Sequence, residues 1–356
     1  NALGVGEQRF RDHLQMELAY ACSALGRRRE AVERYRELYL IFEQRYGSED
    51  PMFLDVISHL ASLYREMGEW DQAEALYPQA LTLAIRLKGP EHVDVLGIEQ
   101  NYAALHHVRG RFEEAESLYR NSLAGMERTG LVNRGAALLV QSNLGELYRD
   151  WGRPEQAEPI LRHVIAVQKD TLGAGHPTTL WALWKLAELQ RDGGRLEEAE
   201  ANFLICLEGY TKSQEPDGLD IATLRVDLAM NHLKQGRASE AEQLLKAALV
   251  VYERELPNDW RRFEIDGQLG ESIAAQGRHE EAESMILTGH QGLIERHENI
   301  TVDAWARRPE SLSRIITFYD SWGKPEDANL WRQRELAKQK KEPGSLASTT
   351  TQSKED

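Results

Sequence analysis

The sequence has 356 residues, of which 41% are hydrophobic and 28% are charged. This balance supplies enough apolar material for a core and enough charge for a large solvated surface, so we expect a soluble, ordered chain. Lys and Arg number 43 against 58 Asp and Glu, which gives a formal net charge of -15. Because such a chain repels phosphate backbones and anionic lipid headgroups at long range, nucleic acids and membrane surfaces are excluded as expected partners.

No apolar run approaches the roughly 18 residues of a membrane-spanning helix, and no cationic start is followed by an apolar stretch and a cleavage site. We therefore expect no membrane insertion. The first residue is Asn1 rather than Met, which suits a segment excised from a longer protein. The two cysteines, Cys22 and Cys206, lie four repeats apart in the register described below, too far for a disulfide across one stack.

The dominant signal is an internal repeat. A segment that begins with glycine and carries alanine five positions later, such as GEWDQAEALY, recurs eight times. The spacings between successive glycines are 42, 42, 42, 42, 42, 41 and 46 residues, which is not expected by chance. We call these the hinge glycines and count positions from them: Gly26, Gly68, Gly110, Gly152, Gly194, Gly236, Gly277 and Gly323.

Each repeat predicts a pair of helices. Before the hinge glycine, apolar residues recur twelve, eight and mostly five or four positions upstream, as at Val56, Leu60 and Leu63. This spacing marks one face of an α-helix, and the series that begins at Ala73 gives a second helix after the glycine. The glycine itself predicts a left-handed turn between the two helices. Alanine at position +5 in all eight copies predicts that two helix backbones approach closely.

In chain order, the loops that restart each hairpin carry Gly, Pro and Asp, as in YGSEDP, KGPEHVD, LGAGHPTT and QEPDGLD. The longer interval before the last hairpin holds extra residues around HENITVDAWARRPE. An amphipathic helix pair cannot bury its apolar face alone, so the eight pairs must stack on one another. We predict an all-α array over residues 1–335 and, because residues 336–356 are polar and of simple composition, a disordered tail.

These features resemble the tetratricopeptide repeat (TPR), in particular the 42-residue class of kinesin light chains and many bacterial proteins. The resemblance is carried by the Leu63–Tyr64 pair, the alanine at position +5, the Gly-x-x-His-Pro linker from Gly173 to Pro177, and a small residue at position −7: Ala61, Ala103, Gly145 and Ala187. It covers about 335 residues and implies a right-handed α-solenoid of eight TPR helical hairpins.

The ending ITFYDSWGKPEDANLWRQREL is similar to the final repeat of TPR arrays attached to large bacterial serine/threonine kinases. The sequence has no glycine-rich phosphate loop, no His-Arg-Asp loop and no Asp-Phe-Gly, so it would be the sensory or scaffold portion of such a protein. We predict a cytoplasmic location. An extracytoplasmic one stays open if the chain is tethered to a membrane-spanning kinase.

The resemblance also implies that the first helix of each pair lines a concave groove. Position −9 of that helix is polar in every copy: Glu17, His59, Asn101, Asn143, Lys185, Asp227, Gln268 and Arg314. In kinesin light chains, asparagines in this column grip the peptide backbone, because a side-chain amide both donates and accepts hydrogen bonds. Asn101 and Asn143 match that pattern. The alternative is that any exposed helix face is polar without binding anything.

Two further features are candidates for binding. Arg149 and Arg191, together with Arg65, stand at position −3 and could fork onto an acidic ligand, although the helix dipole alone favours arginine in a last turn. Trp181 and Trp184 precede Lys185 on the fifth first helix and would be exposed anchors for a partner. The alternative for each tryptophan is packing against the adjacent hairpin as core.

Other kinds of site are not indicated. TPR domains that clamp a chaperone's C-terminal carboxylate have Lys at position −10 and Asn at position −6, and neither column carries these residues here. The sequence has no HExxH, CxxC, GxSxG or Walker loop. His92 and His176 stand in linkers, where a role in starting the next helix suffices. We predict no enzyme, no catalytic residues, no metal and no cofactor.

Three functional classes stay open. The leading hypothesis is a protein-interaction scaffold that binds a peptide or an extended protein segment through His59, Asn101, Asn143, Arg149, Trp181, Trp184, Lys185, Arg191 and Asp227. The second is a regulatory or sensory portion of a larger bacterial serine/threonine kinase. The third is a structural spacer or self-association module.

Overall fold

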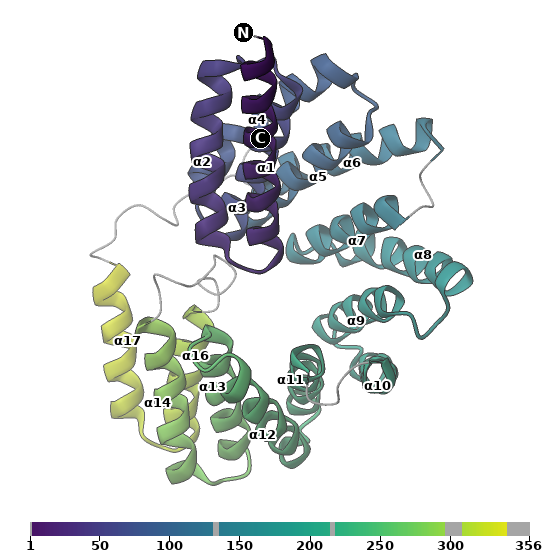
Figure 1. Cartoon of the computed structure of the whole chain (residues 1–356). Helices are drawn as coiled ribbons and strands as arrows, with labels where there is room; N and C mark the ends of the chain where they lie inside the picture. Colours follow the sequence, from purple (N-terminus) through teal and green to yellow (C-terminus); the bar gives the residue numbers. More distant parts are fainter. Residues whose placement is uncertain (1, 131–134, 214–217, 296–307, 340–356) are drawn as a thin grey trace, which may run out of the picture. The chain divides into compact units, whose positions relative to one another are not determined.

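The computed structural model describes residues 2–130, 135–213, 218–295 and 308–339. Helices make up almost all of this part, and it contains no strand (Figure 1). The sixteen helices of the described residues pair as eight antiparallel hairpins, so the predicted all-α solenoid of helical hairpins is confirmed. The chain forms two compact units, Asn1–Ser213 and Gln214–Asp356, each described here by itself.

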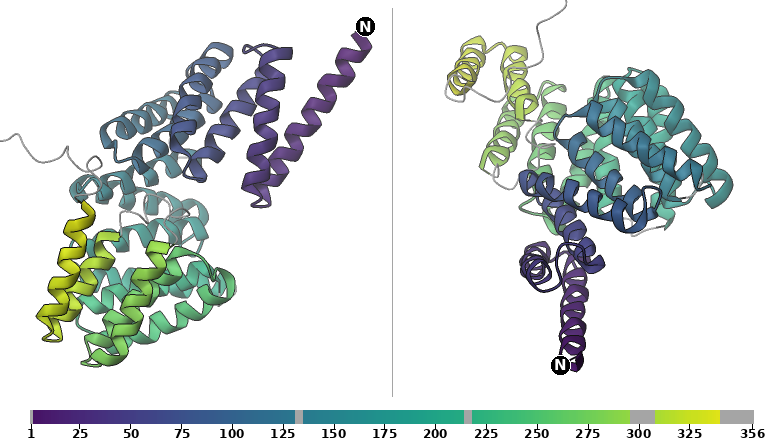
Figure 2. Two further views of the ribbon diagram at one scale, coloured as in Figure 1. Left: turned by 90° about the vertical axis from the view of Figure 1, so that its left-hand side faces the viewer. Right: turned by 90° about the horizontal axis from the view of Figure 1, so that it is seen from above.

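Unit 1 holds five hairpins, and in each the first helix packs against the second (Figure 2). The pairs are α1 (Ala2–Ala24) with α2 (Arg28–Arg45), α3 (Pro51–Glu66) with α4 (Trp70–Lys88), α5 (Val93–Val108) with α6 (Phe112–Arg128), α7 (Gly135–Asp150) with α8 (Pro154–Leu172), and α9 (Pro177–Asp192) with α10 (Leu196–Ser213).

Unit 2 holds three hairpins of the same kind. They are α11 (Leu219–Lys234) with α12 (Ala238–Glu255), α13 (Trp260–Ala274) with α14 (His279–Glu295), and α16 (Arg308–Ser321) with α17 (Pro325–Gln339). The helix α17 continues past the predicted boundary at residue 335. Residues 340–356, where the disordered tail is predicted, lie outside the described part, as do most of the extra residues before α16.

All eight hinge glycines adopt the predicted left-handed backbone, with φ between 70° and 80°. At the second hinge, Gly68 donates its amide to the carbonyl of Arg65, and Glu69 donates to that of Tyr64. These bonds satisfy carbonyls that the end of α3 would otherwise leave without a partner. An L side chain at the glycine would be strained, which explains why the sequence returns to glycine in each copy.

The alanine at position +5 is fully buried in all eight hairpins: Ala31, Ala73, Ala115, Ala157, Ala199, Ala241, Ala282 and Ala328. Position +9 is a second buried column and holds an aromatic ring in four hairpins of unit 1: Tyr35, Tyr77, Tyr119 and Phe203. A small residue next to a large one lets the two helices of a hairpin approach closely while filling the space between them. These columns contribute to the buried cores of both units.

The linkers start the next helix as predicted. Asp50 accepts a hydrogen bond from the amide of Met52 at 2.8 Å, and Pro51 occupies the first turn of α3. His92 and His176 cap α5 and α9 in the same way through Nδ1. A side-chain acceptor at this position satisfies one of the amides that a helix start leaves unpaired. These two histidines thus have a structural role at the helix ends.

The two outer helices of the array differ. In α1, Leu14 and Leu18 are 50% and 43% exposed, although they occupy the columns in which Val56 and Leu60 are buried in the next hairpin. In α17, Arg332 stands at position +9, where the hairpins of unit 1 bury aromatic rings. The helix α1 therefore presents apolar side chains to solvent, and α17 carries a charged residue in a column that is buried in unit 1.

Both cysteines are unpaired and buried, in agreement with the sequence analysis. In the described part of the chain, none of the helices has the length and apolar character that crossing a bilayer requires.

Candidate functional site

The first helices of consecutive hairpins in unit 1 are neighbours, because α3 contacts α5, α5 contacts α7, and α7 contacts α9. Residues at position −9 therefore follow one another across this surface, which we call the first-helix face of unit 1. His59, Asn101, Asn143 and Lys185 belong to it. Asp227 lies on α11 in unit 2, so it is not part of this face.

Asn101 and Asn143 are half-buried in equivalent places on α5 and α7. Within the described residues, neither side-chain amide has a hydrogen-bonding partner, since no bond to either is found there. An amide that is partly removed from water without a protein partner keeps its donors and its acceptor available. Among the predicted binding residues, Asn101 and Asn143 are therefore the two whose side-chain amides have donors and acceptors available for hydrogen bonds to a ligand.

His59 is held by its own hairpin and its neighbour. Its Nδ1 donates to the carbonyl oxygen of Asp55 at 2.8 Å. The ring stacks on Tyr35 with 5.5 Å between centroids and meets the edge of the Tyr20 ring at 5.6 Å. His59 is therefore fixed in orientation by packing.

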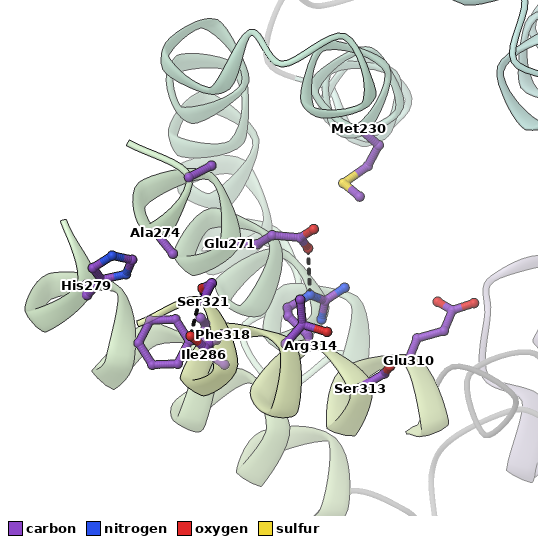
Figure 3. A pocket seen from close by; sticks show the side chains of 12 residues that line it. Met230, Glu271, Ala274, His279, Ile286, Glu310, Ser313, Arg314, Phe318 and Ser321 are labelled. Atoms are coloured by element: carbon purple, nitrogen blue, oxygen red, sulfur yellow. Dashed lines mark hydrogen bonds and ion pairs between the residues drawn. The ribbon is translucent and has the colours of Figure 1, made fainter. Parts of the chain in front are cut away.

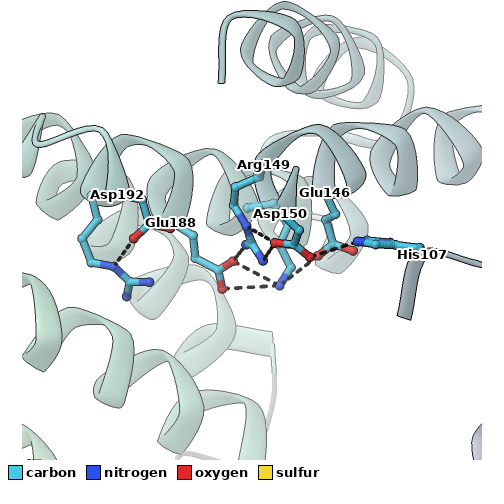
Figure 4. Close-up of polar contacts among 8 residues, drawn as sticks. His107, Glu146, Arg149, Asp150, Glu188 and Asp192 are labelled. Carbon is cyan, nitrogen blue, oxygen red and sulfur yellow. Dashed lines mark hydrogen bonds and ion pairs between the residues drawn. The ribbon is translucent and has the colours of Figure 1, made fainter. Parts of the chain in front are cut away.

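An ion-pair ladder connects α5, α7 and α9 (Figure 4). His107 Nε2 donates to Asp150 at 3.0 Å, and Arg149 binds the other Asp150 oxygen through Nε and Nη2 at 3.0 and 2.9 Å. Arg149 Nη1 also binds Glu188 on α9. The guanidinium that was predicted to fork onto a ligand thus forks onto carboxylates of this chain.

Lys185 continues the ladder. Its ammonium lies 3.1 Å from Glu146 on α7 and 3.4 Å from Glu188 on its own helix. It also sits 5.5 and 5.6 Å from the ring centroids of Trp181 and Trp184, within the range of a cation–π contact. With these four internal contacts, Lys185 connects α9 to α7, and its side chain is only partly accessible.

Burial and pairing set the charges of the ladder. Burial alone would lower the pKa of Arg149, but the attraction of Glu188 and Asp150 outweighs it and raises that pKa. Burial alone would raise the pKa of Asp150, but the hydrogen bond from His107 and the charge of Arg149 lower it below its usual value. Both groups are therefore charged at neutral pH, and each of the two cations, Arg149 and Lys185, is paired with carboxylates of the chain.

Trp184 is only 7% exposed, so the expectation that it forms an exposed anchor is wrong. Its ring meets the edge of Tyr210 on α10, with 6.2 Å between centroids. The reason is that position −10 of α9 turns toward the second helix of its own hairpin. Trp181 is half-buried beside Lys185 and remains the accessible aromatic residue of the pair.

Arg191 is likewise engaged within the chain. Its Nε donates to Asp192 at 3.3 Å, and its guanidinium lies 5.8 Å from the centroid of Phe203 on α10. The side chain is 14% exposed, which leaves a small part of it for any ligand. Whether Arg191 contributes to binding stays a prediction.

Unit 2 contains a cavity of about 700 Å³ that the sequence analysis did not predict (Figure 3). It is bordered by α13, α14 and α16 with one residue from α11. Arg314 and Glu271 are joined by a 2.9 Å ion pair at its wall, and Phe318, Met230 and Ile286 supply apolar surface. Residues at position −6 of three successive first helices border it: Met230, Glu271 and Thr317.

Comparison with family models identifies the repeat. The model described as tetratricopeptide repeat matches residues 53–128, 94–170, 136–204 and 178–254, and a second tetratricopeptide repeat model matches residues 266–286. Together the first set spans more than half of the chain. The chain belongs to the tetratricopeptide repeat family.

Solved structures with the same fold are distant in sequence. The apo quorum sensor NprR from B. thuringiensis aligns at 13% identity and TM-score 0.69, over 92% of this TPR chain and 86% of that one. A Podosopora anserina protein assigned as a kinesin light chain, with nearly identical TPR-like repeats, aligns at 21% identity and TM-score 0.50, over 59% and 99%. A Rap protein complexed with Competence and Sporulation Factor aligns at 12% identity and TM-score 0.53, over 93% and 98%. A search of curated proteins found no match.

The acidic partners of the ladder, Glu146 and Glu188, were missed by the sequence analysis of this TPR protein. Both stand at position −6, and each basic partner comes from a neighbouring hairpin: Lys185 follows Glu146 by 39 residues, and Arg149 precedes Glu188 by 39. Reading the basic and acidic columns together, one repeat apart, would have found these pairs. The described residues hold no group of three or more His, Cys, Asp or Glu side chains arranged for a metal ion.

Proposed function

We propose that this TPR protein is an interaction scaffold that binds a peptide or an extended protein segment on the first-helix face of unit 1. The observation that supports this most directly is the pair of half-buried amides at Asn101 and Asn143, one repeat apart and without partners among the described residues. Two such amides can bond to the backbone of an extended chain, whose donors and acceptors also recur at regular intervals.

The ion-pair ladder beside the two amides favours a ligand that is recognised without a high net charge. Arg149 and Lys185 are already paired with Asp150, Glu146 and Glu188, so an anionic ligand would have to compete with intramolecular pairs. The net charge of -15 adds a long-range bias against polyanions. The partner is therefore a polypeptide recognised mainly through its backbone, with Trp181 as an apolar contact.

The distant structural neighbours are compatible with partner binding. One is described as a quorum sensor and another was solved complexed with Competence and Sporulation Factor. At 13% and 12% identity they support the fold and the general class of function, and the partner of this chain is our proposal alone. A non-catalytic role follows from the same proposal.

The test selects binding peptides from a displayed random library on the full chain and measures their affinities by fluorescence anisotropy. The double variant Asn101→Ala/Asn143→Ala should weaken the selected peptides about tenfold or more, since two buried hydrogen bonds are lost. The matched control is Asn121→Ala, an exposed asparagine on the second helix α6. Equal affinities for the double variant and the control would place the binding surface elsewhere.

Self-association is a second candidate, because α1 exposes Leu14 and Leu18 in columns that the next hairpin buries. Light scattering over a range of concentrations tests it. Self-association through α1 requires a mass above that of the monomer, which Leu14→Glu/Leu18→Glu returns to the monomer value. A monomer at all concentrations would remove this candidate. The kinase-linked alternative stays a prediction from the sequence.

A further inference from the structure

The cavity of unit 2 is independent of the first-helix face of unit 1, and the amides of α5 and α7 play no part in it. Its volume of about 700 Å³ falls within the roughly 300–1,000 Å³ of typical small-ligand sites. Its border combines an apolar wall with a few charged groups, which is the usual composition of a binding pocket. The charges at the cavity border indicate which chemical group it can bind.

The charge at the cavity wall is negative. Glu271 and Glu310 border the cavity directly (Figure 3), and Glu264 lies behind Arg314. Arg314 is the opposing cation, bound to Glu271 at 2.9 Å and to Glu264 at 3.0 Å. Among the described residues of the cavity border there are thus two carboxylates and one guanidinium, and His279 is the only other titratable group.

Arg314 is held in place and is not free to leave its two carboxylates. Its side chain is 10% exposed, and a Cβ at Gly267 would come within 2.9 Å of its Nη1, so the guanidinium rests on bare backbone. Burial opposes its charge, yet the attraction of Glu264 and Glu271 raises its pKa. An anionic ligand would have to displace these bonds, at the cost of leaving a carboxylate unpaired.

One carboxylate at the cavity border has acceptor capacity left over. Glu310 is exposed there and has no ion-pair partner within the described residues. Glu264 does not border the cavity, and its Oε1 holds Arg314 from behind. The surplus of acceptors over donors favours a cationic group with several N–H donors.

We propose that this cavity binds the side chain of a lysine or arginine of a polypeptide partner. The aliphatic stem would lie along Phe318, Met230 and Ile286, and the charged head would reach Glu310 and Glu271. Long basic side chains combine these two requirements, because an apolar stem carries the charge to the acceptors. The occupant is thus defined by one positive charge on a flexible apolar chain.

The experiment uses the full chain with ¹³C-methyl labels on methionine and isoleucine. Met230 and Ile286 report on the cavity, and Met126, buried in unit 1, serves as the internal reference. The probes are the Nα-acetyl, N-methylamide derivatives of lysine, norleucine and glutamate, which share a backbone and differ at the end of the side chain. The lysine derivative should shift the Met230 and Ile286 signals and bind at least about fivefold more tightly than the norleucine one, a difference of one charge-assisted hydrogen bond.

The variants locate the charge recognition. Glu310→Gln should weaken the lysine probe about threefold or more, and Glu271→Gln, which keeps an oxygen for Arg314, should act in the same direction. Glu280→Gln makes the same charge change on α14 away from the cavity border and should leave the affinity unchanged. Asn101→Ala/Asn143→Ala should also leave it unchanged, which separates this proposal from that for unit 1.

Several results would overturn the proposal. They are equal binding of lysine and norleucine derivatives, tighter binding of the glutamate derivative, and the absence of a Met230 or Ile286 shift up to the solubility limit of the lysine probe. Equal losses for Glu310→Gln and Glu280→Gln would also overturn it, because they would reduce the effect to overall charge.

Discussion

The first-helix surfaces of α7 and α9 in unit 1 and of α13 and α16 in unit 2 use the same ion pair with different results. In both, a base at position −9 binds a glutamate at position −6 of the preceding hairpin: Lys185 with Glu146, and Arg314 with Glu271. In unit 1 Glu188 and Arg149 extend the pair into the ion-pair ladder. In unit 2 a cavity of about 700 Å³ lies beside the pair.

The difference comes from positions −3 and −2. Unit 1 places Arg149 and Asp150 there on α7, and these side chains reach toward the neighbouring helices. Unit 2 places Ala274 there at the end of α13 and Ala275 directly after it, and both border the cavity. The residues at positions −3 and −2 therefore distinguish the ion-pair ladder of unit 1 from the open cavity of unit 2. The helical hairpin itself is the same in both.

The largest expected effect concerns the hairpin that carries the cavity. A Cβ at Gly289 would meet the amide nitrogen of Gly267 and the carbonyl oxygen of Phe263, each at 2.6 Å, so Gly289→Ala must separate α13 from α14. We expect a loss of about 3 kcal/mol in the free energy of unfolding. Denaturant unfolding of the full chain, followed by tryptophan fluorescence, measures it.

Gly97→Ala is the matched control, because Gly97 lies inside α5 and its Cβ would meet nothing within 4 Å. Alanine there should stabilise the chain by about 0.5–1 kcal/mol, since it restricts the unfolded state and favours the helix. If both substitutions changed the free energy of unfolding in the same direction, the close approach of α13 and α14 at Gly289 would not account for the stability of this hairpin.

The next prediction compares the stability effect of removing a carboxylate of the ladder, Glu188, with that of removing one at the cavity border, Glu310. Glu188 is 11% exposed and serves both Arg149 and Lys185, so Glu188→Ala leaves two partly buried cations short of a partner. We expect a loss of about 2 kcal/mol, less than for a fully buried pair. Glu310→Ala at the cavity border should leave the unfolding midpoint unchanged, because Glu310 is exposed and unpaired in the described part. A similar midpoint for both variants would contradict this distinction.

A pH effect of opposite sign is expected in the two units. Burial raises the pKa of Asp266 on α13 from 3.8 to about 6, so the folded state binds the proton more tightly and the free energy of unfolding falls as the pH rises through this window. Asp266→Asn should therefore stabilise the chain by about 1.5 kcal/mol at pH 8 and have little effect at pH 3.5. The reduced pKa of Asp150 acts the other way, since its contribution is lost on acidification.

Unfolding curves of the parent and the Asp266→Asn chain across this pH range provide the measurement. The difference between them should grow as the pH rises to about 6 and then level off. A difference that is constant with pH would assign the effect to packing at residue 266 and leave no role for its ionisation.

The fold could be predicted from the columns of hinge glycines and of alanines at position +5. A left-handed turn accepts almost only glycine, and a close approach of two helices accepts almost only alanine. Gly68 and Ala73 are examples, and the structure agrees with both. The surface could be predicted only in part. The amides of Asn101 and Asn143 were identified from their own column, but the burial of Trp184 against Tyr210 depends on how far α9 turns within its hairpin. The helical period alone does not give that angle.

The sequence analysis missed the cavity for a related reason. A cavity forms where several positions on neighbouring helices carry short side chains, and no single position shows this. Ala274 and Ala275 are unremarkable in α13 alone, and their effect appears only when α16 is packed beside them. Arg314 was recognised as one of eight polar residues at position −9, without its partners. Comparing each column with its neighbours one repeat away would have shown short side chains where unit 1 has long ones.

A double variant with little effect on stability gives the most direct test of this comparison. The double variant Ala274→Arg/Ala275→Asp transfers the residues of Arg149 and Asp150 into unit 2. Both sites are at the surface of the cavity, so the free energy of unfolding should change by less than about 1 kcal/mol. The added side chains should fill the cavity and abolish the shift of Met230 by the lysine probe. The added pair has no net charge, and a loss of binding would thus report on space and not on repulsion. Ala275→Ser is the control that keeps the space open, and persistent binding by the double variant would mean that other residues define the cavity.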